Sequence, residues 1–150
     1  MQVPLFTYFK KYNRGLQIAM QDRSPTNTHT KFIESALNGK ILTNKCRNCG
    51  KIMLETVYYC PGCSKTDFEL LEFDGVGSVV THTIQAVAPE GFEDVDSYAW
   101  VVFQVDNAPV RASGFLPGVK LPSDLPIGSR VKVIGYDKKH GLSLQKLSEN

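Results

Sequence analysis

Two pairs of cysteines, each with two residues between its members, constrain this chain more than any other feature of its sequence. Cys46 and Cys49 form the first pair, Cys60 and Cys63 form the second, and ten residues separate the pairs. A tight turn directs both sulfurs of a C-x2-C pair toward one point, so two facing turns supply the four corners of a tetrahedron. The spacing therefore predicts a zinc ribbon, in which the metal has a structural role.

Other chemistry is compatible with the same four cysteines. Iron binds to such a set in rubredoxin-like electron carriers, and paired cysteines also serve as redox thiols. We favour zinc as the cofactor, because four thiolates leave no open coordination position and cytosolic proteins rarely keep stable disulfides. Gly50 permits a backbone angle that most residues resist, and Pro61 stiffens the second turn. Ser64 lies where a glycine would be more comfortable.

The remaining composition is that of an ordinary globular domain. The chain has 150 residues, of which 42% are hydrophobic and 21% are charged, and a chain of this length buries a sizeable core without disulfides. No segment approaches the roughly 20 apolar residues of a membrane span, and residues 1–12 lack the order of a secretory signal. We therefore expect a cytoplasmic protein.

Two helices are predicted in residues 1–39. The first is amphipathic, and its apolar face packs on the protein's own core or docks on a partner. A polar break at residues 22–27 follows it. The second helix is predicted from about Thr30 to Asn38, and Gly39 suits the left-handed residue that closes a helix. The apolar face of the first helix is formed by Leu5, Phe9, Tyr12 and Leu16.

Short β-strands separated by turn residues are predicted from residue 76 onward. Gly75 and Gly77 open the first strand, where a missing side chain permits a bulge and strong coiling. Five strands in about 75 residues favour an OB-type barrel over half of a sandwich. The strands are Val76–Val87, Tyr98–Val105, Val110–Phe115, Arg130–Tyr136 and Leu142–Leu147.

The predicted fold is therefore mainly β with N-terminal helices. An N-terminal helical segment covers residues 1–39, a rubredoxin-like zinc ribbon covers residues 40–72, and a five-stranded OB-fold barrel covers residues 73–150.

No common catalytic motif is present in the sequence: the G-x-S-x-G, P-loop, dinucleotide-glycine and H-E-x-x-H patterns are all missing. His82 lies in the middle of a predicted strand, where a structural hydrogen bond is a better interpretation than a catalytic base. His29 and His140 lie in predicted turns and should be solvated. The same is expected of the acidic loop residues Glu90, Glu93, Asp94 and Asp96. We therefore expect a protein without catalytic residues of its own.

Aromatic residues on one predicted strand have two interpretations. Tyr98, Trp100 and Phe103 are candidates for a base-stacking platform. Alternation along a strand, however, directs Phe103 to the opposite face from the other two, which is typical of ordinary barrel packing.

The order of these parts resembles a family of zinc-ribbon plus OB-fold proteins, the domain of unknown function numbered thirty-five. The resemblance covers about residues 28–147 and implies a non-catalytic accessory subunit of a thiolase-like, HMG-CoA-synthase-like or other acyl-CoA enzyme. It also implies that the OB domain helps to hold or pass acyl-CoA and that the four cysteines are metal ligands. Its motifs are Phe32-x-x-x-x-Leu37-x-Gly39-Lys40, the cysteine pairs, Gly75-Val-Gly77, Ala99 to Val105 and Ile127-Gly128.

Candidate ligand-binding residues of the barrel are His82, Trp100 and Arg111, because a pantetheine arm needs an apolar groove and its phosphates need a basic rim. A nucleic-acid-binding module is the alternative function, since zinc ribbons and OB barrels often bind nucleic acid. Residues 66–110, however, contain nine acidic and no basic side chains, and cationic contacts supply most nucleic-acid affinity. A stand-alone electron carrier is a third hypothesis.

Overall fold

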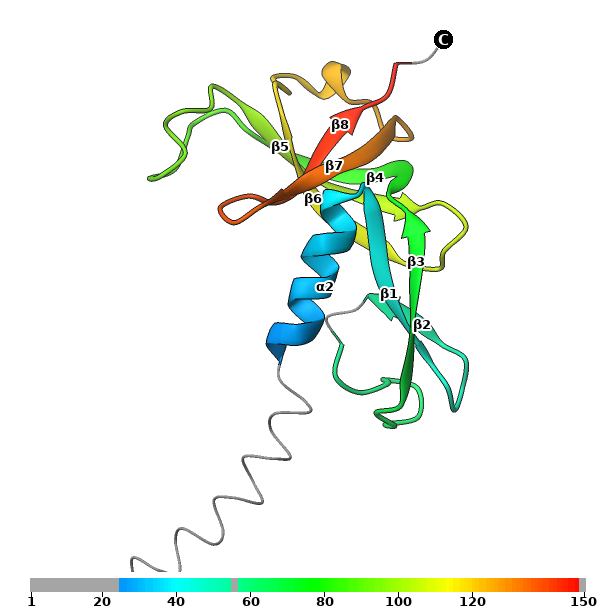
Figure 1. Ribbon diagram of the computed structural model, residues 1–150. Helices are drawn as coiled ribbons and strands as arrows, with labels where there is room; N and C mark the ends of the chain where they lie inside the picture. Colours follow the sequence, from blue (N-terminus) through cyan, green and yellow to red (C-terminus); the bar gives the residue numbers. More distant parts are fainter. Residues whose placement is uncertain (1–24, 55–56, 149–150) are drawn as a thin grey trace, which may run out of the picture.

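The computed structural model of the 150-residue chain describes residues 25–54 and 57–148 (Figure 1). The predicted first helix lies outside these residues. The described elements are α2 (Pro25–Leu37), β1 (Lys40–Cys46), β2 (Ile52–Leu54), β3 (Phe68–Asp74), β4 (Val76–Gln85), β5 (Tyr98–Val105), β6 (Arg111–Pro117), the 3-10 turn η1 (Pro122–Asp124), β7 (Arg130–Asp137) and β8 (Gly141–Lys146).

Helix α2 confirms the predicted second helix but begins earlier, at Pro25, because proline fits the first turn of a helix. Gly39 ends this segment with φ of 71°, and its N–H donates to the Ala36 carbonyl at 2.9 Å. Phe32 and Ala36 face the core. His29, expected in a turn, lies on this helix and makes an edge contact with the Tyr136 ring.

The ribbon sheet has the order β2-β1-β3, with both pairs antiparallel. Its central strand β1 has buried residues on both faces, among them Ile41 and Leu42, which belong to the same apolar core as the barrel. The strands of this sheet were not predicted by range, because β1 lacks the alternation of a half-exposed strand.

The barrel is closed and has the strand order β4-β5-β6-β8-β7, with β4 also pairing with β7. The β6–β8 pair is parallel, and the other pairs are antiparallel. This is the predicted five-stranded OB-type barrel, and each strand end lies within two residues of its predicted position. The predicted domain boundaries themselves stay a prediction.

The long first strand bends at a different residue from the one expected. Its register against β5 shifts between Val79 and Thr81, so the bulge lies at Val80 rather than at the opening glycines. Gly77 instead permits close approach, because a Cβ at this position would lie 2.1 Å from the Gln104 carbonyl oxygen. The missing side chain therefore allows β4 and β5 to pack closely at the edge of the barrel.

One residue, Gly75, joins the ribbon sheet to the barrel. Its N–H donates to the Gly39 carbonyl at 2.9 Å, and its carbonyl accepts from the Val133 N–H at 2.6 Å. A Cβ on Gly75 would lie 2.6 Å from the Gly39 oxygen and 2.8 Å from the Val133 Cβ. The connection is consequently tight and hydrogen-bonded on both sides.

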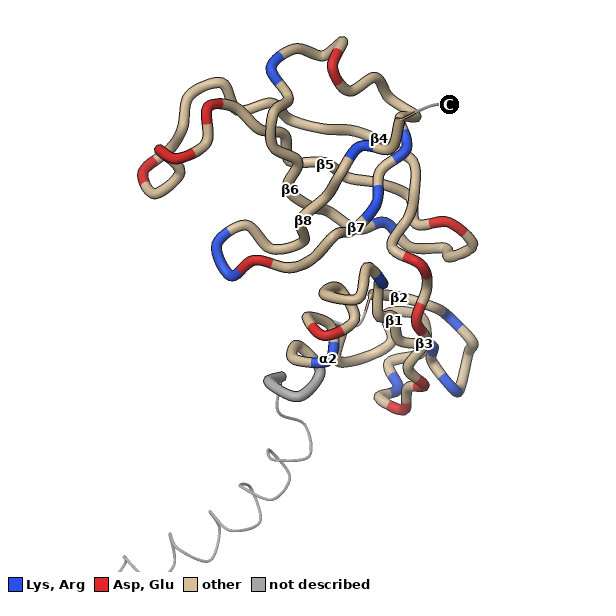
Figure 2. Tube along the Cα trace, turned by 45° about the horizontal axis from the view of Figure 1, so that its top comes forward, with Lys and Arg blue, Asp and Glu red and all other residues tan. Residues whose placement is uncertain are grey.

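Charge is unevenly distributed over the described residues. Figure 2 shows acidic residues on the loop between β4 and β5 and along β3, and basic residues in the ribbon and on β7. No helix among the described residues has the length and apolar character that crossing a membrane requires.

Candidate metal centre and predicted ligand-binding residues

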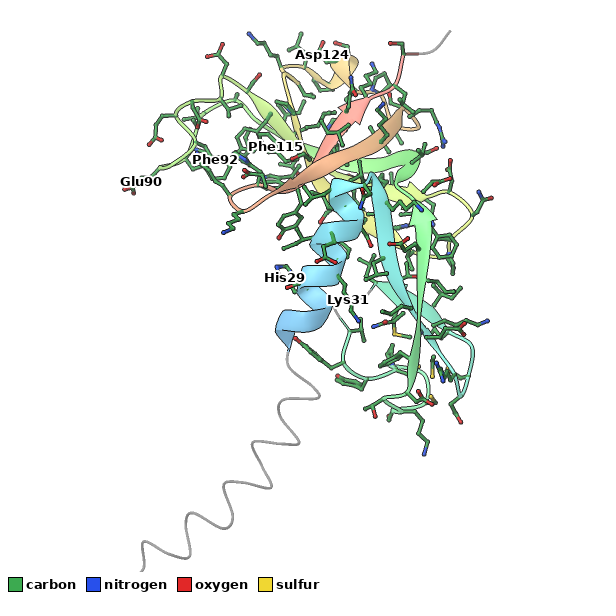
Figure 3. The ribbon with its side chains drawn as sticks, viewed as in Figure 1. His29, Lys31, Glu90, Phe92, Phe115 and Asp124 are labelled. Carbon is green, nitrogen blue, oxygen red and sulfur yellow. The ribbon has the colours of Figure 1, made fainter. Side chains whose placement is uncertain are left out.

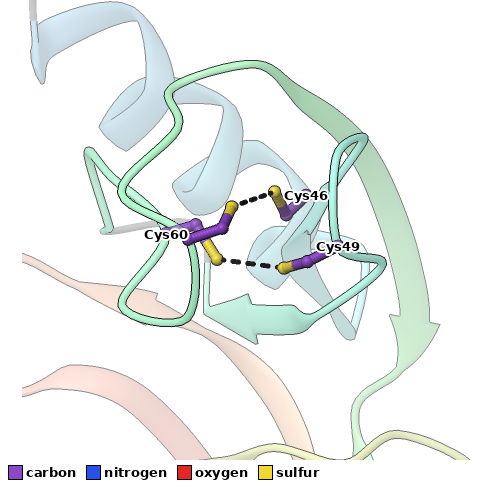
Figure 4. Close-up of side chains that lie close together, drawn as sticks. Cys46, Cys49 and Cys60 are labelled. Atoms are coloured by element: carbon purple, nitrogen blue, oxygen red, sulfur yellow. Dashed lines mark hydrogen bonds between the residues drawn. The ribbon is translucent and has the colours of Figure 1, made fainter.

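The four cysteines lie together at the far end of the ribbon sheet. Their sulfur atoms all lie within 4.8 Å of one another. The Cys46 and Cys63 sulfurs are 3.5 Å apart, and the Cys49 and Cys60 sulfurs are 3.3 Å apart (Figure 4). Four sulfurs about 2.3 Å from one zinc ion are about 3.8 Å from each other. The arrangement is thus compact enough to hold a tetrahedral metal ion.

The two cysteine turns have the same backbone geometry. The Cys46 N–H donates to the Lys51 carbonyl, and the Cys60 N–H donates to the Lys65 carbonyl, both at 2.8 Å. A second bond closes each turn: the N–H of Gly50 donates to the Cys46 carbonyl at 2.8 Å, and the N–H at position 64 donates to the Cys60 carbonyl at 2.7 Å. Each C-x2-C turn therefore presents its two sulfurs on the same side.

Backbone N–H groups near the sulfurs favour thiolates. Hydrogen bonding from the Lys65 N–H, helped by the Asn48 side chain, lowers the pKa of Cys63 to about 6. Burial alone raises the pKa of Cys60, but hydrogen bonds from the Gly62 N–H, the Cys49 side chain and the Cys63 N–H together outweigh burial and lower it. Two of the four sulfurs are therefore prepared to carry negative charge, as a metal ligand must.

The pKa of Cys49 moves in the opposite direction. The Lys51 N–H lowers it, but the hydrogen bond that the Cys49 S–H donates to the Cys60 sulfur, together with burial, raises it to about 12. Crowded sulfurs cannot all be ionised without a cation between them, so protons are retained at some of them. A divalent metal ion would replace those protons.

Packing separates this centre from solvent on one side. Cys46 and Cys60 are fully buried and contact Met53, with Val57 and Phe68 packed against them. Cys49 is exposed. A set of four sulfurs gives a metal no vacant position for water, so the arrangement suits a structural ion.

Sequence reasoning did not predict which backbone groups donate to sulfur. The donors of Lys51 and Lys65 lie two residues after the second cysteine of each pair, and this shared offset is the signal that could have identified them. The Asn48 side-chain contact depends on how the two turns face each other and left no such signal.

The three predicted ligand-binding residues do not converge. His82 lies on β4, where its Nε2 is 2.8 Å from the Leu125 carbonyl oxygen, while its Nδ1 is buried with no partner among the described residues. Leu125 is fully buried in the core directly after η1. His82 therefore ties the η1 turn to the barrel wall, and its role in binding a ligand stays a prediction.

Trp100 and Arg111 lie at different places along the β5–β6 pair. Trp100 is opposite Phe115, and Arg111 is opposite Gln104. The two positions are offset by four residues along β6, or about 13 Å at the usual rise of a strand. The Arg111 side chain is exposed, and its Nε donates to the Gln104 side-chain oxygen at 3.4 Å. Ligand binding by either residue likewise stays a prediction.

The aromatic residues of β5 and His140 lie in different surroundings. Phe103 is buried in the barrel core, whereas Tyr98 and Trp100 contact rings outside it, as alternation predicted. The expectation that His140 is solvated was wrong. Its side chain is only 14% exposed, because it packs between the Phe92 and Phe115 rings.

A four-cysteine ribbon joined directly to a closed OB-type barrel defines the class of protein. No family model matches the chain. Two curated relatives do, both described as DUF35 domain-containing scaffold proteins. The protein from Methanocaldococcus jannaschii is 32% identical over 91 residues, which is 60% of this chain and 63% of that relative. The protein from Pyrococcus furiosus is 32% identical over 71 residues, which is 47% of this chain and 52% of that relative.

Two solved structures have a similar fold. The fold is similar to the Ltp2-ChsH2(DUF35) aldolase, with a TM-score of 0.60 at 20% identity over 78% of this chain and 92% of that one. It is also similar to a DUF35 protein of unknown function from Sulfolobus solfataricus, with a TM-score of 0.57 at 18% identity over 88% and 97%. In sequence this chain is similar to DUF35 scaffold proteins, and in fold it is similar to DUF35 structures. It spans less than two thirds of the length of the curated relatives.

Proposed function

We propose that this chain is a non-catalytic scaffold subunit that binds and stabilises an acyl-CoA enzyme of the thiolase-like or HMG-CoA-synthase-like kind. The observation that carries the proposal is the 32% identity to two proteins described as DUF35 scaffold proteins. An enzyme partner is supported by the description of the structural neighbour, which combines DUF35 with an aldolase. The partner supplies the catalytic residues in this proposal.

The four cysteines would hold one zinc ion with a structural role. Support comes from the closely grouped sulfurs and from the backbone N–H groups that stabilise thiolates. Zinc in such a site contributes on the order of 10 kcal/mol to ordering a small peptide segment. Metal analysis of protein purified without chelator should return one zinc per chain. Protein that is folded without metal, or coloured by iron, would contradict this assignment.

A direct role in holding or passing acyl-CoA is the finer part of the proposal. Because Trp100 and Arg111 lie apart along β5–β6, we expect a complete acyl-CoA site only when the partner is bound. Isothermal titration with acetyl-CoA, on the chain alone and on the complex, separates the alternatives. Binding to neither would restrict the chain to scaffolding.

The partner is tested by affinity capture from native lysate, followed by mass-spectrometric identification. We expect a thiolase-like or related acyl-CoA enzyme that also co-elutes with the chain in size-exclusion chromatography. Recovery of only ribosomal or DNA-associated proteins would support the alternative, a nucleic-acid-binding module. A single-strand titration at two salt concentrations then decides, because phosphate contacts make such binding steeply salt-dependent.

A further inference from the structure

Aromatic rings form a cluster on the outside of the barrel, beneath the loop that joins β4 to β5. Phe92, in this loop, stacks on Tyr98 at 5.5 Å between ring centroids and makes a T-shaped contact with His140 at 4.9 Å. Phe115 lies 4.9 Å from Tyr98 and stacks on His140 at 4.2 Å. Trp100 adds a fifth ring, 5.7 Å from Phe115. Figure 3 labels Phe92 in the loop and Phe115 on the barrel.

An ion pair fastens the loop over this cluster. The Lys139 Nζ lies 3.0 Å from an Asp94 carboxylate oxygen and 5.0 Å from the centre of the Phe92 ring. Lys139 and His140 belong to the turn between β7 and β8. The loop is therefore held to that turn by one aromatic ring and one exposed ion pair, both of which can be exchanged at small cost.

This location is the ligand-binding region of OB barrels in general. Such barrels bind through the face of their second and third strands and through the loops that follow the first and fourth strands. In this chain those elements are β5 and β6, the loop that carries Phe92, and the turn that carries His140. Phe92 thus occupies the place where an OB barrel normally contacts its ligand.

We propose that this face docks an aromatic side chain of a protein partner and that Phe92 fills the same position in the free chain. A ring in this position gains contacts with Tyr98, His140 and Lys139, as Phe92 does. His140 Nε2 is buried with no partner among the described residues. A tyrosine hydroxyl therefore offers a hydrogen-bonding group that phenylalanine lacks.

The charge of this loop indicates which residues flank the partner's aromatic side chain. Residues 86–97 carry four exposed carboxylates and no Lys or Arg. Lys139 neutralises one of these carboxylates, that of Asp94. Lysine or arginine beside the incoming ring would meet the other three, whereas a nucleic-acid phosphate backbone would be repelled. The partner segment is accordingly an aromatic residue, preferably tyrosine, flanked by basic residues.

The test uses the full chain and three five-residue peptides: tyrosine flanked by two basic residues on each side, the same peptide with alanine at the centre, and tyrosine flanked by glutamates. Trp100, the single tryptophan, reports binding through its selectively excited fluorescence. Phe92→Ala should bind the basic tyrosine peptide about fivefold to tenfold more tightly than the unaltered chain. Val87→Ala, at an exposed position of the same loop, is the matched control and should leave affinity unchanged.

Other outcomes overturn the proposal. Equal binding of the tyrosine and alanine peptides would reduce the site to charge attraction, and unchanged affinity in Phe92→Ala would show that Phe92 is not a stand-in. Tighter binding of a single-stranded oligonucleotide would assign the face to nucleic acid. If Phe92→Ala lowers the melting temperature of the barrel, the titrations are repeated with Phe92→Leu, which should also bind the basic tyrosine peptide more tightly than the unaltered chain does. The inference rests on the proposed function only in that the partner is a protein. A failed peptide test beside successful capture of an enzyme would therefore reject this face alone.

Discussion

Gly50 and Ser64 occupy equivalent positions in the two cysteine turns, and both have left-handed backbone angles, with φ of 74° and 58°. Each follows the second cysteine of its pair, and each donates its N–H to the carbonyl of the first cysteine. Glycine adopts this conformation without strain, whereas a serine does not. The second turn therefore contains strain that the first turn lacks.

Replacing Ser64 with glycine should stabilise the metal-loaded protein by about 1 kcal/mol, because it relieves that backbone strain. Gly50→Ala should destabilise the protein by a similar amount. Left-handed backbone strain is the only cause in this variant, since a Cβ at Gly50 meets no atom within 4 Å. Denaturant unfolding of the two variants and the unaltered chain measures both effects. Equal stability of all three would show that the left-handed angles carry no cost.

Cys60→Ser should abolish metal binding and unfold the ribbon while the barrel remains folded. Removing one of four ligands deprives residues 40–66 of the ion that orders them, whereas most residues of the large hydrophobic core lie in the barrel strands and do not depend on the ion. Hydrogen exchange followed by mass spectrometry should show loss of protection confined to the ribbon. Tyr59→Ser, at the neighbouring exposed residue, is the matched control and should retain the metal. A ribbon that stays protected in Cys60→Ser would argue against a structural ion.

Gly77→Ala should destabilise the barrel by at least about 2 kcal/mol, since the new methyl group would collide with the Gln104 carbonyl and strands β4 and β5 would have to separate. Gly135→Ala provides the comparison, because a Cβ there meets nothing within 4 Å. Thermal unfolding of the two variants measures the difference. Similar melting temperatures would mean that the edge of the barrel adapts more easily than its geometry indicates.

Arg130 should make barrel stability depend on acid pH. Its guanidinium donates two hydrogen bonds to Asp106, one of them at 2.9 Å, and lowers the pKa of that carboxyl. A lowered folded-state pKa stabilises the protein above the ordinary Asp value of about 3.9 and loses that effect as pH falls through the folded-state value.

Asp106→Asn should therefore cost about 1 kcal/mol at neutral pH, a modest amount because both side chains are partly exposed. The difference from the unaltered chain should shrink as pH falls below about 4, as followed by denaturant unfolding at a series of pH values. A pH-independent difference would assign the loss to packing rather than to charge.

Local patterns made the barrel and the cysteine cluster predictable. The alternation of Tyr98–Val105 and the breakers around each strand identify elements within two residues of their ends, because inward and outward positions differ in polarity along a half-buried strand. The C-x2-C pairs are equally local. Both features are specified by residues that are close in sequence.

Features that depend on distant contacts were not predictable. Strand β1 has buried residues on both faces and shares one core with α2 and the barrel, so its sequence lacks alternation. The packing of His140 depends on Phe92, 48 residues earlier, folding back over the barrel. The sequence neighbours of His140 and Phe92 do not indicate that contact. Alternation along β4 also does not show that Gly77 permits a close approach of strands rather than a bulge.

The single-residue joint at Gly75 has a mechanical consequence for any complex this protein forms. With its N–H and carbonyl both engaged and no room for even a methyl group, the joint leaves the two halves no freedom to swivel. An enzyme that binds the ribbon would thereby fix the position and orientation of the barrel and of its outer aromatic face. The angle between the ribbon and the barrel is therefore set within the chain, and a partner bound to the ribbon determines where the outer aromatic face of the barrel is presented.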